Sequence, residues 1–370
     1  MQDDTFLLEK LEIREQELAL RSLKKQSDRI DLCSNDYLGL ARNKALQKQI
    51  NQEVSHNQYA HGSTGSRLIS GNHPLFEKAE NKIARFHHAE EALIFNSGYD
   101  ANLGLISAIA GRGDAIIYDY LIHASLRDGI RLSLATAYSF LHNDMRNLEE
   151  KLKRLKRRSF VVVESVYSMD GDEAPLKDLI SLCNRYEANL IIDEAHATGV
   201  IGEKGEGLVQ QLGLEKECFA RIHTFGKALG VHGAAVLGSK TLKQFLINYA
   251  RTLIYTTALP PADVTAISVA YDYFPKMKEE RKHLQQIISH FQKINLPFEK
   301  LPSTTPIQIL IIPGNEEALA LADTLQRKGL DVRAILSPTV PKGKERLRIT
   351  VHAFNTFEDI QKLIVHLQNY

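Results

Sequence analysis

The sequence has few of the features that mark secreted, metal-binding or nucleic-acid-binding proteins. Its three cysteines, Cys33, Cys183 and Cys218, are far apart and have no metal-ligand spacing, which is typical of a reduced compartment and predicts no metal site. Lys and Arg number 46 against 45 for Asp and Glu, so no long-range field favours nucleic acid or an anionic membrane.

Long apolar segments are missing as well. No apolar run approaches membrane-spanning length, and residues 1–10 (MQDDTFLLEK) lack the basic and apolar regions of a signal peptide. The one dense basic run is KLKRLKRR at residues 151–158, beside an apolar stripe formed by Leu148, Leu152 and Leu155. We interpret it as the solvated face of a helix, because no aromatic platform or second basic surface accompanies it. We therefore expect a cytoplasmic protein with no nucleic-acid and no membrane partner.

The chain does have a regular alternation of apolar strands, loops and helices. This alternation runs from about residue 92 to residue 238 and predicts an α/β fold with a doubly wound, mostly parallel sheet. After residue 275 the pattern changes to a long polar helix (276–293), two strands (PIQILIIP and RLRITV) separated by a helix, and a last helix. We expect a large domain at residues 46–275 and a smaller α+β domain formed by residues 1–45 and 276–370. An exposed amphipathic helix is expected at residues 6–25.

Lys227 lies in the segment TFGKALG, between the end of one predicted strand (222–225) and the start of another (234–238). A lysine on such a tight, glycine-rich and apolar turn is poorly placed for a surface charge, because burial disfavours the charged form. A lysine that forms a Schiff base needs this environment. The alternative is an ordinary solvated lysine in a turn.

A carboxylate and an imidazole occur upstream, in NLIIDEAHATG at residues 189–199, where Asp193 ends an apolar strand and His196 follows three residues later. Ligands of open α/β sheets bind at the carboxyl ends of the strands. A pyridoxal phosphate site requires a carboxylate for the pyridinium nitrogen and a lysine for the aldehyde. Asp193 alone could be a helix cap and His196 a core residue. Together with Lys227 they predict pyridoxal phosphate as the cofactor.

The turn Ser97-Gly98-Tyr99 joins a predicted strand (92–96) to a predicted helix (98–110). Backbone N–H groups at a helix N-terminus favour an anion, and glycine permits its close approach, so Gly98 and Tyr99 are candidates for binding a phosphate. Many junctions of this type bind nothing.

Several motifs occur in order along the chain: SNDYLGL (34–40), GSTGSRLISGN (62–72), NSGYDAN (96–102), YSMDGDEAPL (167–176), DEAHATG (193–199) and TFGKALG (224–230). In these motifs the chain resembles the α-oxoamine synthases over nearly its whole length. Members of that family are fold-type I pyridoxal phosphate enzymes that condense an amino acid with an acyl thioester and release carbon dioxide. GSTGSRLISGN and Thr198 are most similar to the members that join L-alanine to a pimeloyl thioester in biotin synthesis.

The resemblance implies roles for particular residues. Lys227, His123 and Asp193 would be catalytic, with His123 over the cofactor ring and Ser168 on its phenolic oxygen. His196 and Thr224 would also contact the cofactor. Thr256 and Thr257, otherwise ordinary strand threonines, would bind the phosphate of the neighbouring subunit, so a homodimer with shared active sites is implied. The residues implied to contact the substrates are Arg21, Thr339 and Arg348, the last binding the amino-acid carboxylate, with Arg346 structural. Relatives tend to have histidine where this chain has Phe76.

The implied reaction begins with L-alanine displacing Lys227 from the cofactor. Lys227 then removes the α-proton, and the resulting carbanion attacks the pimeloyl thioester, whose carrier is coenzyme A or a carrier protein. Three alternatives remain open: a sister synthase that uses glycine or serine, an aminotransferase of the same fold, and a cofactor-sensing regulator. The regulator is least supported, because neither end of the chain has a helix-turn-helix-like extension.

Overall fold

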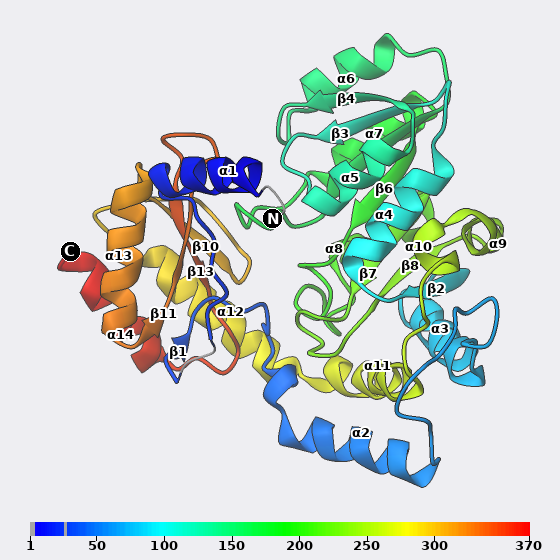
Figure 1. The fold of residues 1–370 in the computed structure, drawn as a ribbon, viewed down its shortest axis with the longest axis horizontal. Helices are drawn as coiled ribbons and strands as arrows, with labels where there is room; N and C mark the ends of the chain where they lie inside the picture. The colour runs from blue at the N-terminus through cyan, green and yellow to red at the C-terminus, as the bar shows by residue number, and fades with distance from the viewer. Residues whose placement is uncertain (1–3, 26–27) are drawn as a thin grey trace. The chain divides into compact units, whose positions relative to one another are not determined.

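A computed structural model describes residues 4–25 and 28–370, which divide into two compact units (Figure 1). The larger unit contains residues 35–168 and 173–281, and the smaller contains the chain up to Ser34, residues 169–172 and residues 282–370. The sequence predicts domain boundaries at 45/46 and 275/276 instead, and the domain division itself stays a prediction. Residues beyond the predicted large domain pack onto the larger unit. Tyr37 is fully buried there, and Arg281 donates to the carbonyls of Phe274 (2.7 Å) and Glu203 (2.9 Å).

The larger unit is built on a seven-stranded sheet in the order β2-β8-β7-β6-β5-β3-β4. Only β8 runs antiparallel to its neighbours, which confirms the mostly parallel sheet predicted from the alternating pattern. Every residue of the central strands β5 and β7 is buried, and in β6 every residue after Asn189 is buried, as expected for strands covered on both faces. The strands are β2 (Glu91–Phe95), β3 (Ala115–Asp119), β4 (Thr136–Phe140), β5 (Ser159–Glu164), β6 (Asn189–Asp193), β7 (Ala220–Thr224) and β8 (Ala234–Gly238).

Helices connect these strands and cover the sheet. Helix α4 packs against α5 and over β7 and β8, whereas α7 packs against α6 and β6. The α-helices of this unit are α2 (Lys44–His56), α3 (Pro74–Phe86), α4 (Gly98–Ile109), α5 (Ala124–Leu132), α6 (Met145–Lys153), α7 (Leu176–Arg185), α8 (Leu208–Gln211), α9 (Lys240–Tyr249), α10 (Arg251–Ile254) and α11 (Pro261–Tyr273). Short 3-10 helices occur at Leu40–Arg42, Glu215–Glu217 and Phe274–Lys276.

The smaller unit is α+β, as the sequence predicts. Its antiparallel sheet has the order β12-β13-β10-β9, and β1 (Ile30–Asp31) pairs in parallel with β11 (Leu330–Asp331). The sheet strands are β9 (Glu299–Lys300), β10 (Ile307–Ile311), β12 (Arg333–Ile335) and β13 (Arg346–Thr350), and the helices are α1 (Thr5–Gln16), α13 (Asn315–Arg327) and α14 (Phe357–Gln368). Helix α12 (Lys278–Lys293) begins in the larger unit and continues in the smaller one from residue 282.

The predicted N-terminal helix at residues 6–25 is too long. Helix α1 ends at Gln16, and Leu18 adopts a left-handed backbone conformation with φ of 54°. None of the side chains of α1 is buried, so no tertiary packing extends the helix beyond this point. Arg21 therefore lies in irregular chain after the helix and not on its surface.

Candidate active site

A cavity of about 260 Å³ lies in the larger unit at the carboxyl ends of the parallel strands. It is the place where ligands of open α/β sheets bind. Side chains from α4, β5, β6 and the turn after β7 meet there, although they are distant in sequence. The residues predicted from the sequence that line the cavity are Gly98, Tyr99, His123, Asp193, His196, Thr224 and Lys227.

Lys227 is half-buried on the turn between β7 and β8. Two backbone hydrogen bonds close the turn: Phe225 N donates to Gly233 O (2.9 Å) and Val231 N to Phe225 O (3.0 Å). Gly230 has φ of +65°, and a Cβ there would lie 2.2 Å from the backbone nitrogen of Ala41, so only glycine fits. The glycine in TFGKALG thus fixes the backbone from which the lysine side chain extends.

The Lys227 ammonium is held by a chain of polar groups. Its Nζ lies 2.9 Å from His196 Nε2, and His196 Nδ1 lies 2.6 Å from the Tyr37 hydroxyl, which donates to Asn35 Oδ1 at 3.1 Å. One proton arrangement satisfies these three contacts. Lys227 donates to Nε2, Nδ1–H donates to Tyr37, and Tyr37 donates to Asn35. His196 therefore accepts from the lysine and aims it.

Asp193 ends β6 and is buried. Its Oδ2 accepts from Asn102 Nδ2 (2.7 Å), and its Oδ1 accepts from Ala195 N (2.9 Å). The Asn102 amide also donates to Ser125 Oγ (3.0 Å), which in turn lies 2.8 Å from His123 Nδ1. Hydrogen bonds thus connect the Asp193 carboxylate to the His123 imidazole through Asn102 on α4 and Ser125 on α5.

His123 caps the N-terminus of α5, accepting from Ser125 N at 3.2 Å, and also lines the cavity. Burial lowers the pKa of the His123 imidazole; the Asp193 carboxylate opposes this shift and the Lys227 charge adds to it. The net shift is downward, so the ring is neutral at pH 7. A capping role and a place in the cavity are compatible, because the ring extends from the cap into the site.

The N-terminus of α4 points into the cavity. Ser97 caps the helix by accepting from Asp100 N (3.1 Å), and a Cβ on Gly98 would come within 2.4 Å of Thr224 Cγ2. The Thr224 hydroxyl is buried, and it has no hydrogen-bond partner within the described part of the chain. A buried unpartnered hydroxyl beside a helix N-terminus is suited to an anion that it can donate to.

Other predicted residues of the larger unit lie outside the set that lines this cavity. Ser168 is buried, and its backbone N–H donates to Glu164 Oε2 at 3.3 Å. Asn96 Nδ2 donates to Thr256 Oγ1 (3.2 Å) and to Thr257 O (2.8 Å), which places both threonines beside the end of β2.

The predicted substrate residues belong to the smaller unit. Arg21 Nη2 donates to Thr339 Oγ1 at 3.2 Å, so these two residues are brought together although they are distant in sequence. Arg348 is buried on β13 and donates to Thr350 Oγ1 at 3.0 Å. Arg346 forms an ion pair with Asp170, in keeping with the structural role expected for it.

Phe76, which stands where relatives tend to have histidine, is buried on α3. The Arg67 guanidinium lies 4.2 Å from the centroid of its ring. The side chain thus packs the helix and holds an arginine of the loop GSTGSRLISGN by a cation–π contact.

Sequence reasoning missed Tyr37, Asn102, Ser125 and Glu164. Two of them occur inside motifs that were recognised: Tyr37 in SNDYLGL and Asn102 in NSGYDAN. Glu164 carries the same signal as Asp193, since both are carboxylates at the end of a buried strand. Its significance depends on the pairing of β5 with β6, which the sequence alone does not specify.

The sequence profile of the aminotransferase class I and II family matches residues 27–367. The chain belongs to this family. Within the family it is 42% identical to the 8-amino-7-oxononanoate synthase of Azoarcus sp. strain BH72 over 348 residues, 93% of this chain and 89% of that protein.

Two solved structures are similar to nearly the whole chain. Serine palmitoyltransferase from Sphingomonas wittichii has a TM-score of 0.88 and 27% identity, covering 99% of this chain and 96% of its own. The 8-amino-7-oxononanoate synthase of Francisella tularensis has a TM-score of 0.79 and 29% identity, covering 93% and 98%. The α-oxoamine synthase resemblance and the fold-type I pyridoxal phosphate transferase fold are thereby confirmed.

Proposed function

We propose that this family member condenses L-alanine with a pimeloyl thioester and releases carbon dioxide, as a step of biotin biosynthesis, with pyridoxal phosphate as cofactor. The observation that carries the proposal is the meeting of Lys227, Asp193 and the N-terminus of α4 in one cavity. The 42% identity to a named 8-amino-7-oxononanoate synthase supports the choice of substrates.

The donor groups of the cavity fit pyridoxal phosphate. Lys227 Nζ is an amine for its aldehyde, Asp193 is a carboxylate for its ring nitrogen, and the unpartnered Thr224 hydroxyl with the N-terminus of α4 suits its phosphate. When bound, the cofactor supplies an electron sink that stabilises negative charge on the Cα of the amino acid.

The chain's own residues then position the substrate and move protons. Lys227, directed by His196 at 2.9 Å, takes the proton from the Cα of L-alanine and later returns one. Neutral His123 offers one ring nitrogen to the substrate, because its other nitrogen contacts Ser125 Oγ. Arg348 would bind the amino-acid carboxylate, and Arg21 with Thr339 would bind the acyl substrate, since a guanidinium matches a carboxylate.

The test is to supply the purified protein with L-alanine and pimeloyl-CoA and to identify the aminoketone product by mass. L-alanine is expected to react faster than glycine or L-serine with this thioester. Clear preference for glycine with acetyl-CoA, or for L-serine with palmitoyl-CoA, would contradict the substrate assignment and favour a sister synthase. Amino-group transfer to a keto acid without any thioester would favour an aminotransferase.

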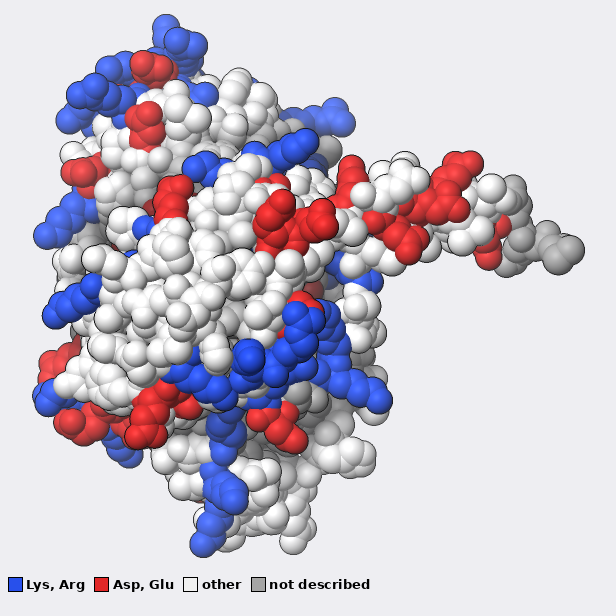
Figure 2. Space-filling model, turned by 90° about the vertical axis from the view of Figure 1, so that its left-hand side faces the viewer, with Lys and Arg blue, Asp and Glu red and all other residues white. Residues whose placement is uncertain are grey.

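We further propose that the protein is cytoplasmic and works as a homodimer with shared active sites. No helix among residues 4–25 and 28–370 has both the length and the hydropathy needed to cross a bilayer. Acidic and basic side chains both occur across the face drawn in Figure 2, in keeping with small-molecule substrates and not a polyanion.

Two exposed apolar side chains on adjoining segments support the dimer. Ala258 N donates to Gly65 O at 3.0 Å, so the loop at residues 62–72 lies beside the segment that carries Thr256 and Thr257. This pair of segments exposes Ile69 (86%) and Tyr255 (72%). Large apolar side chains exposed on adjoining segments are in keeping with a protein partner.

A mixed dimer tests the shared site. A Lys227→Ala chain combined with a Thr256→Ala/Thr257→Ala chain would form one intact site, with its lysine from one chain and its threonines from the other. If each parent homodimer is weak, co-expression should restore roughly a quarter of wild-type activity, because random pairing makes half of the dimers mixed. Mixed dimers no more active than the sum of the parents would show that the threonines do not serve a partner's site.

A further inference from the structure

Glu164 is a second carboxyl group at the base of the cavity, and the proposed reaction does not use it. It ends β5, is 2% exposed and lines the cavity. The register of the parallel strands β5 and β6 pairs Glu164 directly with Asp193. Side chains of paired residues leave the same face of a sheet, so the two carboxyl groups are neighbours.

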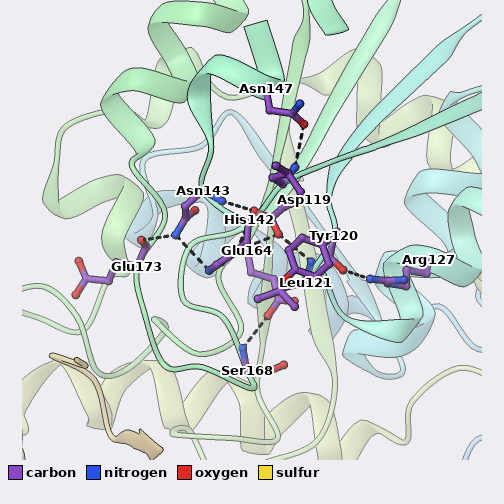
Figure 3. A network of polar contacts seen from close by, with 11 residues as sticks. Asp119, Tyr120, Leu121, Arg127, His142, Asn143, Asn147, Glu164, Ser168 and Glu173 are labelled. Atoms are coloured by element: carbon purple, nitrogen blue, oxygen red, sulfur yellow. Dashed lines mark hydrogen bonds and ion pairs between the residues drawn. The ribbon is translucent and has the colours of Figure 1, made fainter. Parts of the chain in front are cut away.

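The two carboxyl groups differ in their hydrogen bonds. Asp193 accepts from Asn102 Nδ2 at 2.7 Å and from Ala195 N at 2.9 Å, one donor on each oxygen. Glu164 Oε2 accepts from Ser168 N at 3.3 Å (Figure 3). Its Oε1 is buried and has no hydrogen-bond partner among the residues that the structure describes. Two adjacent buried carboxyl groups do not both ionise readily, and the better-solvated one keeps the charge.

We propose that Glu164 carries a proton in the folded protein and is a positioning residue, whose neutral carboxyl group leaves Asp193 as the single anion at the base of the cavity. The proton on Glu164 provides an O–H donor where a second negative charge would otherwise lie. Only the role of neutral Glu164 in the reaction rests on the proposed function. The protonation of Glu164 is a property of the folded chain itself.

The charged groups around Glu164 come from several elements. Burial raises the pKa of the Glu164 carboxyl to about 8, and the Asp193 charge adds to the shift, while Lys227 opposes it, as do the backbone N–H groups of His123 and Ser168. Of these groups, Lys227 lies on the turn after β7, and His123 is the N-cap residue of α5.

The nearby Asp119 is paired with His142 at 3.0 Å (Figure 3). The strand register matches Tyr118 with Val162, so alternation places Asp119 on the opposite face of the sheet from Glu164.

The sign of the linked pH dependence follows from these pKa values. The folded chain keeps the proton of Glu164 up to a pKa of about 8, whereas the unfolded chain releases it near the ordinary value of 4.5. The contribution of Glu164 to the free energy of unfolding is therefore largest at low pH. It falls as pH rises from 4.5 to 8. Glu164→Gln keeps the shape and the neutral state but removes the titration.

The experiment compares the melting temperature of full-length wild type and of Glu164→Gln from pH 6 to pH 9, with and without added pyridoxal phosphate. The melting temperature of the variant should rise relative to that of wild type as pH rises, with the difference in Tm growing by about 3 °C for a chain of this length. Glu203→Gln, at an exposed glutamate, is the control whose difference should stay constant. A constant difference for Glu164→Gln as well would overturn the proposal.

A second measurement does not depend on the variant folding. Infrared or carboxyl-carbon NMR spectra of wild type with labelled glutamate should show two glutamates that titrate well above the ordinary range: Glu164 near pH 8, and Glu194, whose pKa burial raises to about 7. Spectra in which no glutamate titrates near pH 8 would overturn the proposal. In the Asp193→Asn protein the same titration should shift to lower pH, because the neighbouring charge is gone.

These readouts separate the two proposals. If Glu164 is protonated but L-alanine and pimeloyl-CoA give no aminoketone, the proposed function fails and the inference about Glu164 stands. If the product forms while no glutamate titrates near pH 8, the reverse holds.

Discussion

Replacing Lys227 with alanine is expected to abolish covalent capture of the cofactor and to lower turnover by about 10⁴-fold or more, the upper range for one acid–base group. The turn between β7 and β8 carries the amine, and His196 Nε2 accepts from it at 2.9 Å. Alanine keeps the backbone and removes both the nucleophile and the base. Borohydride reduction followed by peptide mapping should find the cofactor on the peptide that contains Lys227 in wild type and on no peptide in the variant.

Two controls separate chemistry from folding. Lys204→Ala, at an exposed lysine of the same unit, should keep the adduct and the turnover. Small primary amines added to Lys227→Ala should restore part of the activity, because a diffusible base can occupy the vacated space. An adduct that persists on another lysine would remove Lys227 from its proposed role.

Three of the cavity residues identified from the sequence lie at junctions between predicted strands, turns and helices. Asp193 ends an apolar run of strand length, Gly98 follows such a run and opens a helix, and Lys227 lies between glycines that join two strands. Strand ends of a parallel sheet meet at one edge. For such residues, periodicity and turn chemistry predict both the element and its place in the site.

The residues that were missed depend on contacts that no local pattern encodes. Asn102 donates to Asp193 across 91 positions of sequence, and Tyr37 contacts His196 across 159. Glu164 matters because the β5–β6 register sets it beside Asp193. The extent of α1 was predicted wrongly for a related reason. The spacing of its apolar residues predicted an exposed amphipathic helix as far as residue 25, but none of its side chains is buried, and packing is what extends a helix.

The Asp193→Asn protein should still capture the cofactor on Lys227 but turn over about 10³-fold or more slowly, the scale of losing one preorganised electrostatic group. Asparagine keeps the size of the side chain and loses the charge that holds a proton on the ring nitrogen, without which the ring is a weaker electron sink. The measurement is kcat, together with the visible absorbance that reports bound cofactor. Near-normal kcat with full absorbance would remove the Asp193 charge from the mechanism.

A lost hydrogen bond could be mistaken for a lost charge, because Asp193 accepts from the Asn102 amide at 2.7 Å. The structure offers a control. The Oδ1 of Asn102 has no hydrogen-bond partner among the described residues, so the side-chain amide of Asn102 can rotate by about 180° and its Oδ1 can accept from the amide of an asparagine at position 193. The swapped double variant Asp193→Asn/Asn102→Asp keeps one carboxylate and one amide in contact but moves the charge to α4. If the position of the charge is what matters, the swap should stay as slow as Asp193→Asn. Recovery to within about tenfold of wild type, a difference of only about 1.4 kcal/mol in the barrier, would mean that the contact and not the placement of the charge carries the effect.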